Sequence, residues 1–194
     1  MARKSIDLTY STPTEWTATA LSDFDHFLID HANCERKASA LAMSFVVRYP
    51  DKVKIIPALI ELAKEELEHF DETYQLMQRR GLELGKDKPD PYVNKLLKHA
   101  RHGLHERFID RMLIASIVES RGAERFGLIA EAHPEKDICT FYERLYKAEL
   151  KHAHLFAKLL LEYVDEDIVY ARLRELNTIE ADIIKRLPWR AALH

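Results

Sequence analysis

Two short segments decide the fold: residues 64–70 read KEELEHF and residues 148–156 read AELKHAHLF. Each contains a glutamate followed three residues later by a histidine. Residues three apart lie on one face of a helix, with Cβ atoms about 5–6 Å apart, so such a pair can bind a single metal ion. The two pairs are Glu66 with His69 and Glu149 with His152. One such motif arises readily by chance, but two in one helical chain indicate a metal site.

The surrounding sequence places these motifs on bundle helices. Apolar residues recur every three or four positions along four segments, which is typical of the inward face of a bundle helix. On each of these four faces a glutamate stands where an apolar residue is expected. These glutamates are Glu35, Glu66, Glu119 and Glu149. Burying four unpaired carboxylates would destabilise the fold severely. Two divalent cations would balance the four negative charges, so the pattern predicts a two-metal site.

The spacing of the glutamates supports this interpretation. In an antiparallel helical hairpin, residues at equal height are equidistant from the turn. The midpoint of Glu35 and Glu66 falls on Pro50-Asp51, and that of Glu119 and Glu149 falls on Pro134. Both midpoints carry helix-breaking residues. The chain therefore predicts two similar hairpins, with one glutamate on the first helix and a Glu-x-x-His motif on the second helix of each.

We therefore expect one all-α domain over residues 1–194. One glutamate from each of two helices and Glu-x-x-His from each of the other two is the ligand arrangement of ferritin-like di-iron bundles. Five glycines and seven prolines in 194 residues agree with a chain that has few turns. The expected parts are hairpin one at about 14–80, a long crossover at about 81–103, hairpin two at about 104–163 and an additional C-terminal helix at about 165–187.

Finer signals predict individual helix ends. Thr12-Pro13-Thr14-Glu15 resembles a capping box, and Ser22 with Asp25 suggests a break in the first long helix. The second helix is expected from about Asp51 to Arg80, ending at Gly81. Further helices are expected at about 92–102, 104–132, after Pro134 to 163, and 165–187.

Composition excludes several classes of protein. No stretch approaches the roughly 18 apolar residues that span a membrane. The basic opening residues lack the apolar run of a signal peptide. Two isolated cysteines, Cys34 and Cys139, favour reduced thiols, and hence a cytoplasmic location. The formal net charge of −3 does not by itself indicate nucleic-acid binding.

Four segments together resemble the bacterial tRNA 2-methylthio-isopentenyl-adenosine hydroxylases. They are DHANCERKASA (30–40), KEELEHF (64–70), VESRGAERF (118–126) and AELKHAHLF (148–156). The resemblance covers about residues 20–160. It implies a ferritin-like non-haem di-iron monooxygenase that hydroxylates the isopentenyl group of a modified adenosine beside the anticodon of tRNA. It implies dioxygen and an electron-donor protein as partners.

The resemblance also implies the ligand set, for metal binding and catalysis alike. The positions that match the family's iron ligands are Glu35, Glu66, His69, Glu119, Glu149 and His152. By analogy with the superfamily, Glu66 and Glu149 would bridge two iron ions. The residues alone leave the metal open, because carboxylates and imidazoles suit manganese as well as iron and do not exclude zinc. A bacterioferritin-like or rubrerythrin-like ferroxidase or peroxidase remains the alternative function.

For several other residues, the sequence allows two interpretations. His31, one turn before Glu35, fits either a supporting contact to that ligand or a satisfied core histidine. Gly122, one turn after Glu119, fits either space for dioxygen or substrate or close helix packing. Cations in and after the crossover and near the C-terminus fit either tRNA contacts or ordinary surface charge. The cations are Arg79, Arg80, Lys86, Lys88, Lys95, Lys98, Arg101, Arg107, Lys185, Arg186 and Arg190.

Overall fold

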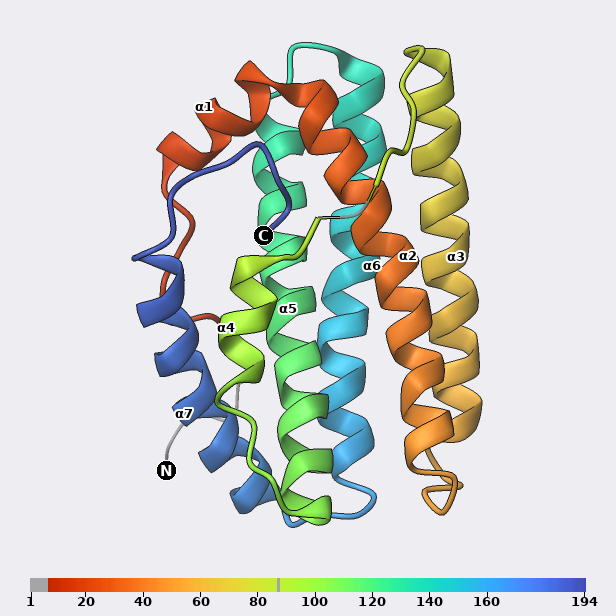
Figure 1. The fold of residues 1–194 in the computed structure, drawn as a ribbon, viewed down its shortest axis with the longest axis vertical. Helices are drawn as coiled ribbons and strands as arrows, with labels where there is room; N and C mark the ends of the chain where they lie inside the picture. The colour runs from red at the N-terminus through yellow and green to blue at the C-terminus, as the bar shows by residue number, and fades with distance from the viewer. Residues whose placement is uncertain (1–6, 87) are drawn as a thin grey trace. The chain divides into compact units, whose positions relative to one another are not determined.

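The computed structural model describes residues 7–86 and 88–194, and the described residues form helices and no strands. The helices are α1 (Thr14–Ser22), α2 (Phe24–Arg48), α3 (Ile56–Arg79), α4 (Pro91–Leu97), α5 (Leu104–Ala132), α6 (Lys136–Leu160) and α7 (Glu166–Ile184) (Figure 1). They fall into two compact units. The α2–α3 unit lies within residues 18–88 and 190–193, and the α5–α6 unit lies within residues 1–17, 89–189 and 194.

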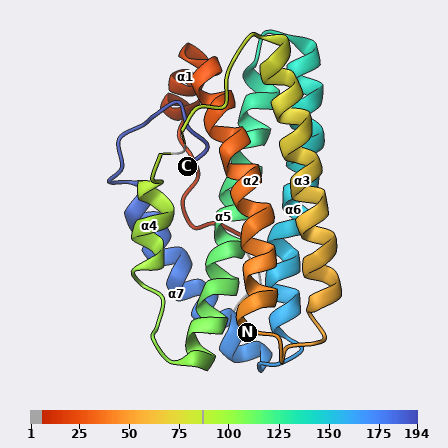
Figure 2. The same cartoon turned by 45° about the vertical axis from the view of Figure 1, so that its right-hand side comes forward.

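The α2–α3 unit is an antiparallel hairpin, whose two helices lie side by side in both views (Figures 1 and 2). Its apolar faces bury Leu28, Phe45, Leu59 and other side chains of the same stripes. The Ser39 hydroxyl on α2 donates a hydrogen bond of 2.7 Å to the Ala63 carbonyl oxygen on α3. This bond fixes the register of the hairpin within one turn of Glu35 and Glu66.

Helix α3 ends as the sequence predicts. Gly81 has a φ of 71°, a left-handed conformation that glycine adopts without steric cost. The Gly81 N–H donates to the Gln78 carbonyl, and the Leu82 N–H donates to the Met77 carbonyl. This pair of bonds is a Schellman motif, which satisfies carbonyls at the end of the helix.

The α5–α6 unit contains the second hairpin, with Phe108, Phe126, Tyr142 and Phe156 buried in its core. Its turn lies at His133-Pro134, as the midpoint of Glu119 and Glu149 predicts. The Ser116 hydroxyl on α5 donates a hydrogen bond of 2.6 Å to the Ala153 carbonyl oxygen on α6. Each hairpin is therefore tied near its glutamates by a serine hydroxyl and an alanine carbonyl.

Helices α4 and α7 pack against α5 within the same unit. Asp110 on α5 is fully buried and accepts hydrogen bonds from Arg101, which precedes α5, and from Arg172 on α7. Burial raises the pKa of Asp110, but the Arg172 and Arg101 donors outweigh it, so the pKa lies below its usual range. This cluster ties the end of the crossover to α7.

Several predicted helix ends differ from the structure. The break in the first long helix is real, but Asp23 rather than Ser22 caps α2, accepting from the His26 N–H at 3.4 Å. The Thr12 hydroxyl and amide donate hydrogen bonds to Glu124 instead of capping α1, because this half-buried carboxylate on α5 is within reach. Helix α3 begins at Ile56, since the chain from Asp51 makes successive turns. The helix in the crossover ends at Leu97 rather than about residue 102.

The predictions for the other elements are confirmed within two or three residues. The glycine- and proline-rich residues 81–90 form a loop in the part that the structure describes. Among the described residues, no helix combines the length and the apolarity that crossing a membrane requires.

Candidate metal centre

In the α2–α3 unit, three predicted ligands come together. Glu35 projects from α2, and Glu66 and His69 project from α3, all buried at 7% exposure or less. The His69 Nδ1 atom lies 3.7 Å from Glu66 Oε2 and 3.8 Å from Glu35 Oε2. The Glu-x-x-His spacing therefore does place both side chains on one helix face, as predicted.

Two further contacts in the α2–α3 unit involve Glu35 and His69. His31 is fully buried, and its Nε2 atom lies 2.6 Å from Glu35 Oε1. The Thr73 hydroxyl donates to the carbonyl oxygen of His69 at 2.7 Å. The sequence left His31 with two interpretations, and the structure shows that it contacts the Glu35 carboxylate directly.

In the α5–α6 unit, Glu149 and His152 project from α6 and are each 2% exposed. His152 Nδ1 lies 3.1 Å from Glu149 Oε2. Glu119 on α5 has intermediate exposure, so the structure places it in a more accessible position than the other five predicted ligands.

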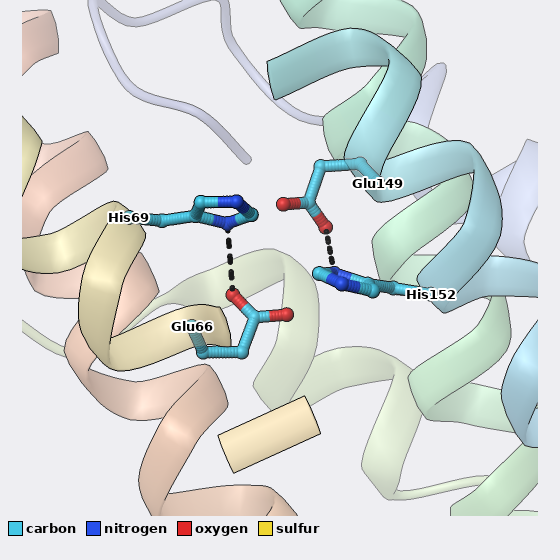
Figure 3. A group of neighbouring side chains, drawn as sticks. All are labelled: Glu66, His69, Glu149 and His152. Carbon is cyan, nitrogen blue, oxygen red and sulfur yellow. Dashed lines mark hydrogen bonds and ion pairs between the residues drawn. The ribbon is translucent and has the colours of Figure 1, made fainter. Parts of the chain in front are cut away.

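Among the described residues, one buried group of carboxylates and imidazoles could hold a metal ion: Glu66, His69, Glu149 and His152 (Figure 3). Each residue offers one ligand atom, and these atoms all lie within 4.8 Å of one another. Glu35 and Glu119 are not part of this group, although Glu35 lies beside His69.

The donor set of this group fits a metal centre. Two ligand atoms bound to one transition-metal ion at about 2.0–2.2 Å are separated by roughly 3 Å when their bonds are at right angles. The nitrogen-to-oxygen distances of 3.1 and 3.7 Å within the two Glu-x-x-His pairs are close to this value. Carboxylate and imidazole ligands also suit iron and manganese. The chemistry, burial and spacing are therefore compatible with a metal site.

Other candidate ligands lie elsewhere. His99, His102, His105 and His154 are exposed. Cys34 and Cys139 are half-buried, and neither forms a disulfide. Glu65 and Glu68, which flank Glu66, are exposed.

Sequence reasoning missed a buried ionic network in the α5–α6 unit. Arg121 is fully buried and donates two hydrogen bonds, of 2.9 and 3.0 Å, to the buried Glu180 carboxylate on α7. The Tyr92 hydroxyl donates to the same carboxylate at 3.0 Å. Burial and the Glu180 charge raise the pKa of Tyr92 well above its usual range.

A second buried arginine lies beside this network. The Arg125 guanidinium stacks 4.6 Å from the centre of the Trp16 ring. Burial and the charge of Arg121 lower the pKa of Arg125 to about 10, so it remains a cation at neutral pH. A signal for both arginines was present in the sequence, because Asp110, Arg121 and Arg125 recur at helical spacing on a face of α5 away from Glu119.

Comparison with a solved structure identifies the fold class of the chain. The structure matches that of a Synechococcus protein described as "Protein 43 with aldehyde deformylating oxygenase activity", with a TM-score of 0.92 and 31% sequence identity. The match covers 96% of this chain and 94% of the Synechococcus chain. The predicted fold class is thereby confirmed: the chain is all-α and ferritin-like, a four-helix bundle with one long crossover and an additional C-terminal helix.

Sequence comparison then identifies the family. Residues 2–194 match the family described as tRNA-(MS[2]IO[6]A)-hydroxylase (MiaE), and the chain belongs to this family. The tRNA 2-(methylsulfanyl)-N(6)-isopentenyladenosine(37) hydroxylase of Pseudomonas putida is 31% identical over 174 residues, covering 90% of this chain and 84% of the relative. The protein of the same name from Salmonella typhimurium is 33% identical over 131 residues, which are 68% of this chain and 48% of the relative.

Proposed function

We propose that this protein is a non-haem di-iron monooxygenase that hydroxylates the isopentenyl group of a hypermodified adenosine next to the anticodon in tRNA. The observation that carries the proposal is the buried Glu66, His69, Glu149 and His152 group in a chain that belongs to a tRNA hydroxylase family from end to end. Both curated relatives carry names that state this reaction. The proposed place of action is the cytoplasm.

Six residues would hold two iron ions: Glu35, Glu66, His69, Glu119, Glu149 and His152. Bound iron would supply the redox chemistry that hydroxylation of an unactivated C–H bond by dioxygen requires. The overall reaction takes one C–H bond, one dioxygen, two electrons and two protons to one C–O–H group and one water. The two electrons come from an external donor.

The protein's own side chains would prepare this site in three ways. Burial of the four-residue group keeps bulk water away from the oxidising centre. His31 would orient the Glu35 carboxylate through the 2.6 Å contact, as residues behind metal ligands commonly do. The Ser39 and Ser116 bonds would keep the ligand-bearing helices of each hairpin in register.

The substrate is a polyanion, so tRNA binding would use exposed cations. Lys86, Lys88 and Lys98 are exposed and lie in or beside the crossover. Arg101 was a candidate for this role, but its guanidinium is bound to Asp110. Arg80 is likewise paired, with Asp25 at 2.7 Å. The exposed lysines are therefore better candidates for phosphate contacts than these two arginines.

The experiment that tests this function supplies tRNA carrying the prenylated adenosine to iron-loaded protein with a chemical reductant and dioxygen. Nucleoside mass spectrometry should show one added oxygen atom on the prenylated nucleoside. The Glu149→Ala variant should lose the product while circular dichroism stays helical. A control with unprenylated tRNA should give no product.

The opposite result would favour the ferroxidase alternative. If the prenylated tRNA remains unoxidised while the same protein rapidly oxidises and mineralises added ferrous iron, the hydroxylase proposal is wrong. Sizing by light scattering in the same experiment would show whether a storage cage forms.

A further inference from the structure

A groove lies on the outer side of the helix that carries Glu149 and His152. Its volume is about 540 Å³, and it is formed by α6 and the start of α7, within the α5–α6 unit. The residues that line it are Leu150, Lys151, His154, Leu155, Ala157, Lys158, Leu161 and Tyr170. None of these lining residues is an acid.

The groove combines an apolar floor with a basic rim. Leu150 and Leu161 are 37% and 38% exposed, so both present apolar surface to the solvent. Lys151, His154 and Lys158 are exposed around them. Lys151, His154 and Lys158 are three or four residues apart, so their side chains share one face of α6. Asp167 precedes Tyr170 by one turn on α7, but it does not line the groove.

The groove is separated from the candidate metal ligands by one helix. His154 follows His152 by two residues and so projects about 200° round α6 from it. A partner seated in the groove would therefore lie roughly one helix diameter, about 10–12 Å, from His152. The proposed reaction consumes two external electrons, and this face offers a short route for them through a ligand-bearing helix.

We infer that this groove is the docking site for an acidic, one-electron iron–sulfur donor protein; the inference rests on the proposed function. Apolar centres with polar rims are the general pattern of protein interfaces. The basic rim is complementary to an acidic partner and would steer its approach. Electron-transfer complexes bury little surface, below about 1,200 Å² in total, so such a partner needs only a small docking face.

A protein fits this groove better than RNA does. Half of the lining residues are apolar (Leu150, Leu155, Ala157 and Leu161), whereas nucleic-acid interfaces are more polar and more strongly basic. For each hydroxylation, two reduced donor molecules would be oxidised by one electron each. Together with two protons, these electrons balance the formation of one hydroxyl group and one water from dioxygen.

The test uses full-length, iron-loaded protein and a plant-type [2Fe–2S] ferredoxin as the acidic, one-electron probe. The altered protein is the double variant Lys151→Glu/Lys158→Glu, with the milder Lys151→Gln/Lys158→Gln in case charge reversal perturbs folding. The matched control is Lys136→Glu, an exposed lysine at the other end of the same helix. Calorimetry measures binding at low and high salt, and stopped-flow spectroscopy measures reduction of the ferric centre.

The wild type and Lys136→Glu should bind ferredoxin with an affinity that falls as salt rises. The double variants should bind at least tenfold more weakly and be reduced at least tenfold more slowly by ferredoxin. Reduction by dithionite, a small molecule that needs no docking, should be the same in all proteins.

Four results would overturn the inference. Ferredoxin could bind and reduce the double variants as well as it does the wild type, or it could fail to bind the wild type. The double variants could instead weaken tRNA binding, which would make the groove an RNA surface. They could also convert a dimer to a monomer, which would make it a contact between copies. Hydroxylation of tRNA with a chemical reductant is measured separately, so failure of the proposed function would be recognised by loss of that reaction.

Discussion

At the level of single residues, the α5–α6 unit buries charge in three separate places. They are the proposed ligand pair Glu149 and His152, the ion pair of Arg121 with Glu180, and Asp110 with its two arginine partners. A buried ion pair contributes little net stability, yet breaking it leaves an uncompensated charge in a dry environment. The Arg121 network is therefore a structural feature whose loss should destabilise the protein without altering the proposed metal ligands.

Replacing Arg121 by Met should lower the free energy of unfolding by about 3–5 kcal/mol, because Glu180 would remain buried without its cation. The double variant Arg121→Met/Glu180→Gln should cost less than the sum of the single variants, since glutamine still accepts the Tyr92 hydrogen bond. Urea unfolding followed by circular dichroism measures both. A loss below about 1 kcal/mol for Arg121→Met would show that the pair is unimportant for stability.

Gly122, buried on α5 one turn after Glu119, tests whether space beside the proposed ligands serves turnover. Gly122→Leu should leave the protein folded and metal-loaded but reduce turnover, because the added side chain would exclude dioxygen or substrate. The matched control is Gly127→Ala on the same helix, whose Cβ would meet the Tyr146 ring at an ordinary 3.5 Å. Unchanged turnover in Gly122→Leu would show that this glycine serves helix packing.

At the level of helices, sequence periodicity predicted the long elements and failed at contacts between distant segments. The Pro134 turn, the Gly81 stop and the burial of Glu35, Glu66 and Glu149 all follow from local chemistry or from helical spacing. The Thr12 bond to Glu124 joins residues more than a hundred positions apart, and no local pattern predicts it. The sequence also did not predict the intermediate exposure of Glu119, because exposure depends on how the elements pack.

Helix α4 is held both by a local N-terminal cap and by contacts with a residue distant in the sequence. Asp90 caps it by accepting the Tyr92 and Val93 N–H groups, at 2.8 and 3.3 Å. His194, far along the chain, lies 3.4 Å from the same carboxylate and stacks on the Tyr92 ring. Burial raises the pKa of Asp90, but the His194 interactions and the two backbone donors outweigh it and lower the pKa to about 2.

Asp90 should therefore make stability depend on pH in acid. A carboxyl whose pKa is lower in the folded state stabilises the protein above its unfolded pKa of about 3.9 and loses that contribution as pH falls toward 2. Asp90→Asn should lower the free energy of unfolding by about 2 kcal/mol at pH 5–7. The difference from wild type should shrink between pH 4 and pH 2. Chemical unfolding across this range measures it, and a difference that does not vary with pH would refute the role of the charge.

At the level of the whole molecule, the two hairpins of the chain share the same two features. Each hairpin carries a Glu-x-x-His motif on its second helix and a serine-to-carbonyl bond between its helices. The functional proposal requires ligands from both hairpins, so neither Glu-x-x-His motif alone should sustain the centre.

Purified protein loaded with ferrous iron under anaerobic conditions should bind two iron ions per chain. Glu66→Ala and Glu149→Ala should each abolish the paired site, because each removes a carboxylate from the buried four-residue group. Elemental analysis with absorption spectroscopy of the oxidised protein measures this. The exposed neighbour Glu65→Ala is the control and should retain both ions. Two irons retained in both ligand variants would contradict the assigned ligands.

The most direct test of the monooxygenase proposal follows the source of the oxygen atom. Iron-loaded protein, a reductant and prenylated tRNA are incubated either with heavy-oxygen dioxygen in ordinary water or with ordinary dioxygen in heavy-oxygen water. Mass spectrometry of the nucleosides should find one heavy oxygen atom in the hydroxylated product from labelled dioxygen and none from labelled water. A product whose oxygen comes from water, or no product while dioxygen is consumed, would contradict the proposal that this protein is a dioxygen-dependent tRNA hydroxylase.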